Sequence, residues 1–250
     1  MLKIKPTAKL PLKQFVNKGS YKERLEYAKI LNDTFYEKLM QEQSHETVSV
    51  DSLKKILNET IPENIDLDVK TTGGMFANPY FAVIKNKEDE IYKLELLVPS
   101  RKNLSGKEYL CSKDNYMIMH ETFHLFSGIS NPKHNIRPFF DDSEQEFYRG
   151  RIYNLFESKK FGIKEKLRFK KRLQEFLSKQ DSEKQINFLQ RCRYNLTEEI
   201  LAFKESEKYG GKSKNLAKWL FFEEKLKIIK KFLYKILMRA RKNTKTLVGS

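Results

Sequence analysis

The chain has 250 residues, enough to bury a substantial core in one large domain or two small ones. Hydrophobic residues make up 39% of it, including 18 Phe and 12 Tyr, which excludes global disorder; the two cysteines, Cys111 and Cys192, exclude a disulfide framework and are expected to be structural thiols. The formal net charge of +16 would attract a polyanion such as nucleic acid, an anionic membrane surface or an acidic protein; a general compositional bias toward lysine, with the side chains in water, is the alternative.

Residues 1–20 are basic, contain Pro6 and Pro11 and show no hydrophobic period, so they are predicted to form a flexible basic arm. Lysines interrupt this segment every few residues, which is not the pattern of an ordinary secretory signal. The apolar stretch from Trp219 to Met238 carries two glutamates and five lysines, so it is not expected to span a membrane. We therefore expect a cytoplasmic protein, or a secreted effector exported without an ordinary signal peptide.

Two helices and a hairpin are predicted in the first hundred residues. The first helix covers residues 21–41, where apolar side chains recur at three- and four-residue spacings: Leu25, Ala28, Leu31, Phe35 and Leu39. A shorter helix is expected to follow Asp51, whose side chain can cap it. Residues 80–84 and 91–98 have the composition of strands and flank the polar turn 86–90, which predicts a β-hairpin.

From Asp114 onward the pattern is helical. Asp114 can cap a helix that runs to Ser127, with Gly128 as its expected C-terminal stop. Ser143 is expected to open another helix, with Glu146 as its capping-box partner. Further helices are predicted at residues 164–178, 182–209 and 215–242, with Gly210-Gly211 as a break.

The predicted helix after Asp114 contains the run Met117–Phe126, in which His120, Glu121 and His124 form the pattern HExxH in apolar surroundings. The whole chain has only four histidines. Burying two imidazoles and a carboxylate is unfavourable by several kcal/mol unless each finds a partner. Histidines at i and i+4 lie on one helix face with Cβ atoms about 5–6 Å apart, so both can reach one divalent cation at about 2.0–2.1 Å.

Glu121 follows the first of these histidines and is rotated away from it by about a quarter turn of the helix. Its carboxylate would therefore face a water molecule on the metal rather than the metal itself. This is the arrangement that hydrolysis requires, because the cation lowers the pKa of the water and the carboxylate accepts its proton and later delivers it to a leaving amine. Glu121 is the candidate general base.

The sequence from His120 to His124, with its apolar flanks, resembles the active-site helix of the zincin metallopeptidases, and the preceding hairpin fits the edge-strand sheet of that superfamily. The resemblance covers about ten of the 250 residues. It implies a zinc peptidase that binds one Zn²⁺ and a protein or peptide substrate running antiparallel to the edge strand. The fold expected is α+β and zincin-like, with a small, mainly antiparallel sheet, an active-site helix and a mostly helical C-terminal half. This domain would cover residues 21–209.

A zinc site of this type needs a third protein ligand. The metzincin extension is absent, since its glycine and third histidine would fall at Ser127 and Ser130. A glutamate is the remaining option, and Glu199 is preferred because it lies beside the apolar stripe of its helix while Glu198 is predicted to point the opposite way. The segment Glu199–Ala202 also resembles the ExxA pattern of the glutamate-type zincins. An ion pair of Glu199 with Arg191, Arg193 or a lysine is the alternative.

Glu144 is the rival third ligand, 20 residues after His124. Its place in the first turn of a predicted helix already accounts for an acidic residue there, because the backbone dipole favours one. His134, in the loop that follows the motif, could donate a hydrogen bond to the oxyanion of a tetrahedral intermediate, and Tyr194 is a weaker candidate for that role.

A different class of function would rest on residues 212–250, predicted to form a basic amphipathic helix and tail. From Lys212 to Lys242 there are nine lysines and two arginines against two glutamates. One face of this helix is apolar, and cations line another at four-residue steps: Lys227, Lys231, Lys235 and Arg239. The alternative hypothesis is therefore a basic module that docks on an anionic membrane or nucleic acid, with a structural or inactive HExxH site. The competing interpretation of this helix is packing onto the domain with its lysines in water.

Overall fold

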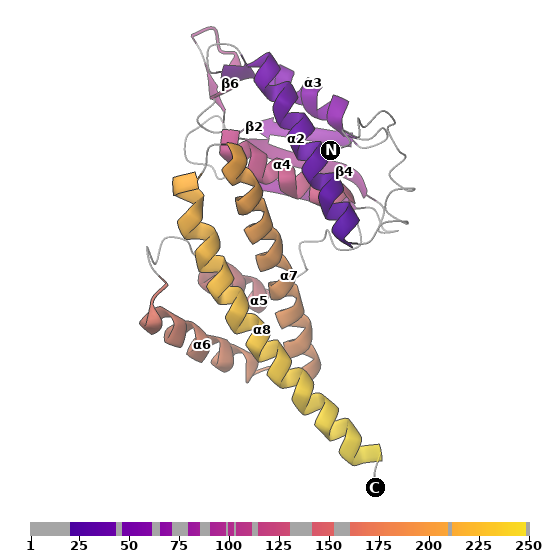
Figure 1. The fold of residues 1–250 in the computed structure, drawn as a ribbon, viewed down its shortest axis with the longest axis vertical. Helices are drawn as coiled ribbons and strands as arrows, with labels where there is room; N and C mark the ends of the chain where they lie inside the picture. Colours follow the sequence, from indigo (N-terminus) through magenta and orange to yellow (C-terminus); the bar gives the residue numbers. More distant parts are fainter. Residues whose placement is uncertain are drawn as a thin grey trace, which may run out of the picture. The chain divides into compact units, whose positions relative to one another are not determined.

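The computed structural model divides the chain into two compact units (Figure 1). The first unit comprises Met1–Ile136 and Glu205–Gly211, and the second comprises Arg137–Lys204 and Lys212–Ser250. The residues that the structure describes are 21–43, 47–61, 66–71, 80–85, 91–98, 100–102, 104–111, 115–130, 142–152, 161–209 and 212–248. The predicted arm, the turn at 86–90, the Gly210-Gly211 break and His134 lie outside them.

The first unit contains the helices α2 (Tyr21–Glu42), α3 (Val50–Thr60) and α4 (Asn115–Ser130). The predicted stripe of α2 is buried at Ala28, Leu31, Phe35 and Leu39, which confirms this helix. The cap predicted for α3 was wrong, because the Ser49 hydroxyl accepts a hydrogen bond from the Ser52 amide at 3.0 Å. Asp51 lies instead in the first turn, where the helix dipole favours an acid.

Two small sheets complete the first unit. Strands β1 (Thr47–Ser49), β6 (Glu108–Cys111) and β5 (Arg101–Lys102) pair in that order, antiparallel throughout. In the second sheet, β4 (Ile91–Val98) lies between β2 (Asp66–Thr71) and β3 (Tyr80–Lys85). The antiparallel β3–β4 pair is the predicted hairpin, whereas β2 pairs with β4 in parallel. The α+β class expected from the sequence is therefore confirmed.

Helix α4 is the central element of the first unit, because it packs against α2 as well as against β3 and β4. Its apolar side chains are fully buried at Ile118, Met119, Phe123, Leu125 and Phe126. The predicted stop was wrong, since the helix continues past Gly128 to Ser130; Asp114, its predicted cap, lies outside the described residues. Gly128 was therefore not sufficient to terminate α4.

The regular elements among the described residues of the second unit are all helices. It contains α5 (Asp142–Phe147), the π-helical turn η2 (Tyr148–Ile152), α6 (Ile163–Leu177), most of α7 (Ser182–Ser206) and α8 (Lys212–Val248). The last residues of α7 and the short 3₁₀ helix η3 (Glu207–Tyr209) belong to the first unit. Helix α5 begins at Asp142, so the predicted cap Ser143 lies inside its first turn rather than before it.

Helix α8 is part of the core of the second unit. Phe222, Ile229 and Leu233 are buried there with side chains from α6 and α7, such as Leu173 and Phe188. The apolar stripe predicted for the C-terminal helix is therefore covered by the rest of the unit, and exposed lysines remain on its other side. Within the described part of the chain, no helix combines the length and the apolar character that crossing a membrane requires.

Candidate metal centre

The two histidines of the HExxH motif lie side by side on α4, as their spacing predicted. Their Nε2 atoms are 3.3 Å apart, and their rings are nearly perpendicular, with centroids 4.8 Å apart and planes at 82°. His120 is buried and His124 is half-buried. Both imidazoles thus direct the same kind of nitrogen toward one point beside the helix.

The separation of the two Nε2 atoms can be compared with the spacing of two ligands on one metal ion. Two ligand nitrogens that each lie about 2.05 Å from a tetrahedral ion are separated by about 3.3 Å. The observed 3.3 Å therefore fits two ligands of one ion, and it is also within reach of an N–H···N hydrogen bond between His120 and His124.

Glu121 lies beside this pair on α4. Its carboxylate Oε1 is 4.0 Å from the Nε2 atom of His120, too far for a direct hydrogen bond. The side chain is only 14% exposed, so the carboxylate is held near the histidines in a partly desolvated position. A carboxylate set back from the two imidazoles in this way can accept a proton from a water molecule on an ion without ligating the ion itself.

A buried polar contact fixes the turn of α4 that carries the motif. Thr122 Oγ1 donates to Asn32 Oδ1 on α2 at 2.7 Å, and Asn32 Nδ2 donates to the Met119 carbonyl at 3.3 Å. Neither Asn32 nor Thr122 is exposed. Thr122 is the residue between Glu121 and Phe123, so this contact sets the position of α4 at the motif itself.

Sequence reasoning missed Asn32, although the sequence carries a sign of it. Asn32 lies four residues after Ala28 and three before Phe35, on the buried stripe of α2. A polar residue on such a stripe needs a partner, because an unpaired amide in the core is unfavourable by about 1–3 kcal/mol. The identity of that partner, 90 residues away, is not visible in the sequence.

The end of α7 and η3 are fastened to α2 inside the first unit. Tyr209 donates a hydrogen bond to Asp33, and its ring lies 4.4 Å from that of Tyr36. Burial and the Asp33 carboxylate raise the pKa of Tyr209 well above its usual value. Lys29 and Lys208 both approach Glu205, at 3.8 and 2.5 Å. The last turn of α7 is therefore held against the helix that supports α4.

Glu199, the preferred third ligand, lies on α7 in the second unit and is half-buried. The neighbouring apolar positions Leu196, Ile200 and Phe203 are buried, as predicted. Glu198 lies on the opposite side of α7 from this stripe, as predicted, but it is buried as well: together with Ala202 and Glu205 it forms a second buried face at four- and three-residue spacings. Of the predicted site residues that the structure describes, His120, Glu121 and His124 lie in the first unit, whereas Glu199 belongs to the second.

Glu144, the rival ligand, has a different explanation. It is buried in the second unit, and Arg191 Nη2 donates to both of its carboxylate oxygens. An ion pair of this kind accounts for a buried carboxylate without any metal. Arg191 was also a candidate ion-pair partner for Glu199, and here it pairs with Glu144.

The remaining predictions concern two thiols and an aromatic residue. Cys192 is buried in the core of the second unit, where burial raises the pKa of its thiol, as expected for a structural cysteine. Cys111 is half-buried on β6. Tyr194 lies on α7 and is half-buried.

Comparison with known proteins adds no relative. No family model matches the chain, and neither the curated proteins nor the solved structures contain a significant match. The zincin resemblance therefore extends no further than the motif and its surroundings. What can be concluded about function depends on the chemistry of His120, Glu121 and His124.

Proposed function

We propose that this protein is a zinc-dependent metallopeptidase with a zincin-like first unit. His120 and His124 would bind one Zn²⁺, and Glu121 would act as the general base. The observation that carries the proposal is the 3.3 Å separation of the two Nε2 atoms, which equals the ligand spacing of a tetrahedral ion. Imidazoles are ordinary zinc ligands. His120 is buried and His124 half-buried, and a bound cation would give their polar nitrogens a partner.

When bound, the zinc would supply a Lewis acid that polarises the scissile carbonyl and lowers the pKa of a water molecule. Glu121 would accept the proton of that water as it attacks the carbonyl carbon, and would then deliver the proton to the departing amine. Its partial burial supports this role, since a carboxylate shielded from bulk water exchanges protons with the reacting groups rather than with solvent.

Glu199 is proposed as the third protein ligand. Two histidines and one glutamate are a donor set that zinc uses in catalytic sites, with the fourth position left for water. Glu199 precedes Glu205 by six residues on one continuous helix, which corresponds to about 9 Å along its axis. Because Glu205 and Tyr209 are fastened to α2, the helix that bears Glu199 ends within the unit that bears the histidines.

The substrate would be an extended peptide. Strand β3 lies at one edge of its described sheet, and α4 packs against β3 and β4. A peptide that adds to an exposed edge forms main-chain hydrogen bonds whatever its side chains are, and pockets then set the preference. Pairing antiparallel to β3 would carry the peptide alongside the helix of the motif.

The proposal is tested by comparing zinc-loaded wild type with Glu121→Gln on a mixture of fluorogenic peptides. Loss of a general base typically lowers the rate by about 10²–10⁴-fold, and the variant should keep its zinc. Glu23→Gln, an exposed glutamate on α2, is the matched control and should cleave as the wild type does. A Glu121→Gln variant that hydrolyses peptides at the wild-type rate would overturn the assignment.

A further inference from the structure

The two units differ sharply in charge. The second unit has 28 lysines and arginines against 13 aspartates and glutamates, a net charge of +15, whereas the first has 21 against 20. A compositional bias toward lysine would act on the whole chain and would not leave one unit almost neutral. The charge of the second unit therefore needs an explanation specific to that unit, and attraction to a polyanion is the direct one.

Helix α6 presents an unusual outer side. Phe169, Leu173 and Leu177 face the core of the second unit, at four-residue steps. Away from them, Ile163 is 78% exposed and Leu167, one turn later, is 58% exposed. Two aliphatic side chains one turn apart are thus left in water by a helix that has a buried face elsewhere.

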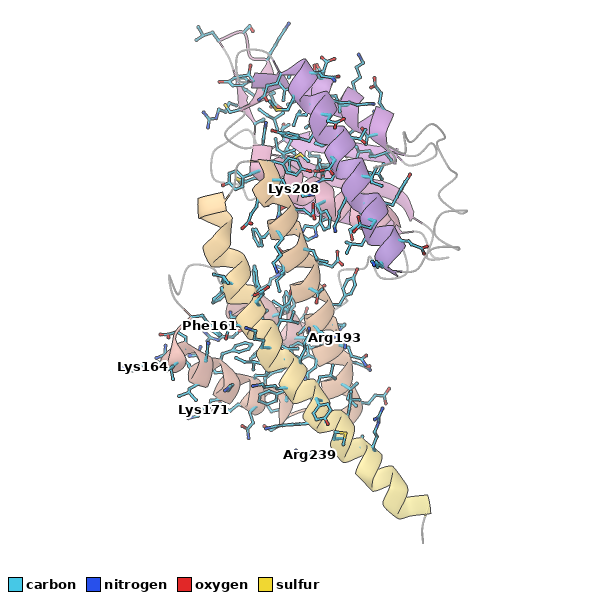
Figure 2. All side chains as sticks on the ribbon, viewed as in Figure 1. Phe161, Lys164, Lys171, Arg193, Lys208 and Arg239 are labelled. Atoms are coloured by element: carbon cyan, nitrogen blue, oxygen red, sulfur yellow. The ribbon has the colours of Figure 1, made fainter. Side chains whose placement is uncertain are left out.

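Cations surround these two aliphatic side chains. Lys164, Arg168, Lys170 and Lys171 are all exposed on α6, and Figure 2 labels Lys164 and Lys171 along that helix. We name Ile163, Lys164, Leu167, Arg168 and Lys171 the α6 face. Apolar residues flanked by long basic side chains are typical of helices that lie at a membrane surface, with the aliphatic groups in the acyl boundary and the cations at the headgroups.

A contact connects α6 to α8, which carries the basic row Lys227, Lys231, Lys235 and Arg239. Glu224 of α8 pairs with Lys166 of α6 and with Lys227 of its own helix, both at 2.6 Å. Their hydrogen bonds lower the pKa of Glu224 to about 2. No acidic residue follows it between positions 225 and 250 of the sequence, where nine lysines and arginines occur. Glu224 therefore links α6 to α8 as a carboxylate that is paired with one lysine of each helix.

We propose that the second unit docks onto an anionic lipid bilayer through the α6 face, with the basic row of α8 adding long-range attraction. The occupant is a bilayer rather than a nucleic acid, because phosphates would account for Lys164, Arg168 and Lys171 but would leave Ile163 and Leu167 without a role. A bilayer accounts for both, since its headgroups carry charge and its acyl chains receive aliphatic groups. This docking is independent of the peptidase activity proposed for the first unit.

The expected size of the effect follows from the charges. Each basic residue close to an anionic membrane strengthens binding by roughly fivefold, so removing three cations should weaken it by about 100-fold. Raising the salt concentration should weaken wild-type binding as well, because the attraction is screened within a Debye length of about 8–10 Å. Removal of the two aliphatic side chains should weaken binding at any salt concentration.

The test is co-sedimentation of the full chain with vesicles of phosphatidylcholine alone or with about one third phosphatidylserine. Wild type should bind only the anionic vesicles. Lys164→Gln/Arg168→Gln/Lys171→Gln should bind them about 100-fold more weakly. Lys54→Gln/Lys55→Gln/Lys107→Gln, which removes three exposed lysines of the first unit, should bind as wild type does.

A second pair of variants separates a bilayer from a nucleic acid. Ile163→Ser/Leu167→Ser should lose vesicle binding, whereas Ile30→Ser, at an exposed aliphatic residue of α2, should keep it. Circular dichroism checks that every variant is folded. The proposal would be overturned if wild type ignored anionic vesicles, or if Ile163→Ser/Leu167→Ser bound them normally. If wild type and Ile163→Ser/Leu167→Ser bound duplex DNA equally tightly and neither bound the anionic vesicles, the cations would be assigned to a nucleic acid instead.

Discussion

Replacing Asn32 by leucine tests how the motif helix is held in place. Asn32 Nδ2 donates to the Met119 carbonyl at 3.3 Å, and its Oδ1 accepts from Thr122 at 2.7 Å. Leucine has nearly the same shape but makes neither bond. The Thr122 hydroxyl would then keep only its longer contact with the Met119 carbonyl, at 3.3 Å. We therefore expect the first unit to be destabilised by about 1–3 kcal/mol.

The reciprocal variant and the double variant give the interaction free energy between Asn32 and Thr122. Thr122→Val leaves the Asn32 amide partly unsatisfied and should also be unfavourable by about 1–3 kcal/mol. The double variant replaces both partners by apolar groups of similar shape, so its destabilisation should be smaller than the sum of the two by about 1–2 kcal/mol. Such a coupling is expected only for residues in direct contact.

Hydrogen exchange of the α4 amides is the suitable assay. It reports on the first unit separately, whereas the single tryptophan, Trp219, lies in the second. Asn58→Leu, at an exposed position of α3, is the matched control and should change protection by less than about 0.5 kcal/mol. If the Asn32 and Thr122 effects were simply additive, or each were as small as that of the control, the buried contact would not position α4.

Three further predictions concern the second unit and the third ligand. Glu199→Ala should abolish zinc binding, whereas Glu144→Ala should retain zinc. Glu144→Ala should instead destabilise the second unit by about 3–5 kcal/mol, because it removes the buried carboxylate that pairs with Arg191. Elemental analysis and urea unfolding measure the two effects, and an outcome in which Glu144→Ala loses zinc while Glu199→Ala keeps it would reverse the assignment. Because the pKa of Glu224 is lowered to about 2, its contribution to folding stability is complete above the unfolded pKa near 4.3 and is lost as the pH falls toward 2. The stability of Glu224→Gln should therefore fall less steeply than that of wild type in this pH window. Acid unfolding curves identical to those of wild type would contradict this. Lys225 donates to two main-chain carbonyls of η2 at 2.5 and 2.9 Å, so Lys225→Met should destabilise the second unit by about 2–4 kcal/mol in urea, and a neutral effect would show that η2 does not need this contact.

Local patterns in the sequence predicted the structural features that are set by residues close together in the chain. Helix α2 followed from its apolar spacing, and the β3–β4 hairpin followed from two strand-like runs around a polar turn. The approach of His120 and His124 could be predicted because residues four apart on one helix must share a face. In each case the geometry is set within a single element or between two consecutive ones.

Contacts between distant segments could not be predicted in the same way. Strand β2 pairs in parallel with β4 although β3 comes between them in the sequence, and the residues of β2 do not indicate which strand it pairs with. The partner of Glu144 is Arg191, 47 residues later, although the sequence offered many cations. The burial of Glu198 was not predicted, because one apolar stripe was taken to be the only buried face of α7. Periodicity identifies which residues are buried, but not what covers them.

Zinc content tests the central claim most directly. Wild type, Glu121→Gln, His120→Ala and His45→Ala would be purified from zinc-supplemented cultures and analysed for metal by mass spectrometry. We predict one zinc ion per chain in wild type, in Glu121→Gln and in His45→Ala, which removes a histidine outside the motif, and none in His120→Ala. A well-folded wild-type protein that contains no zinc, and takes up none on titration, would contradict the account.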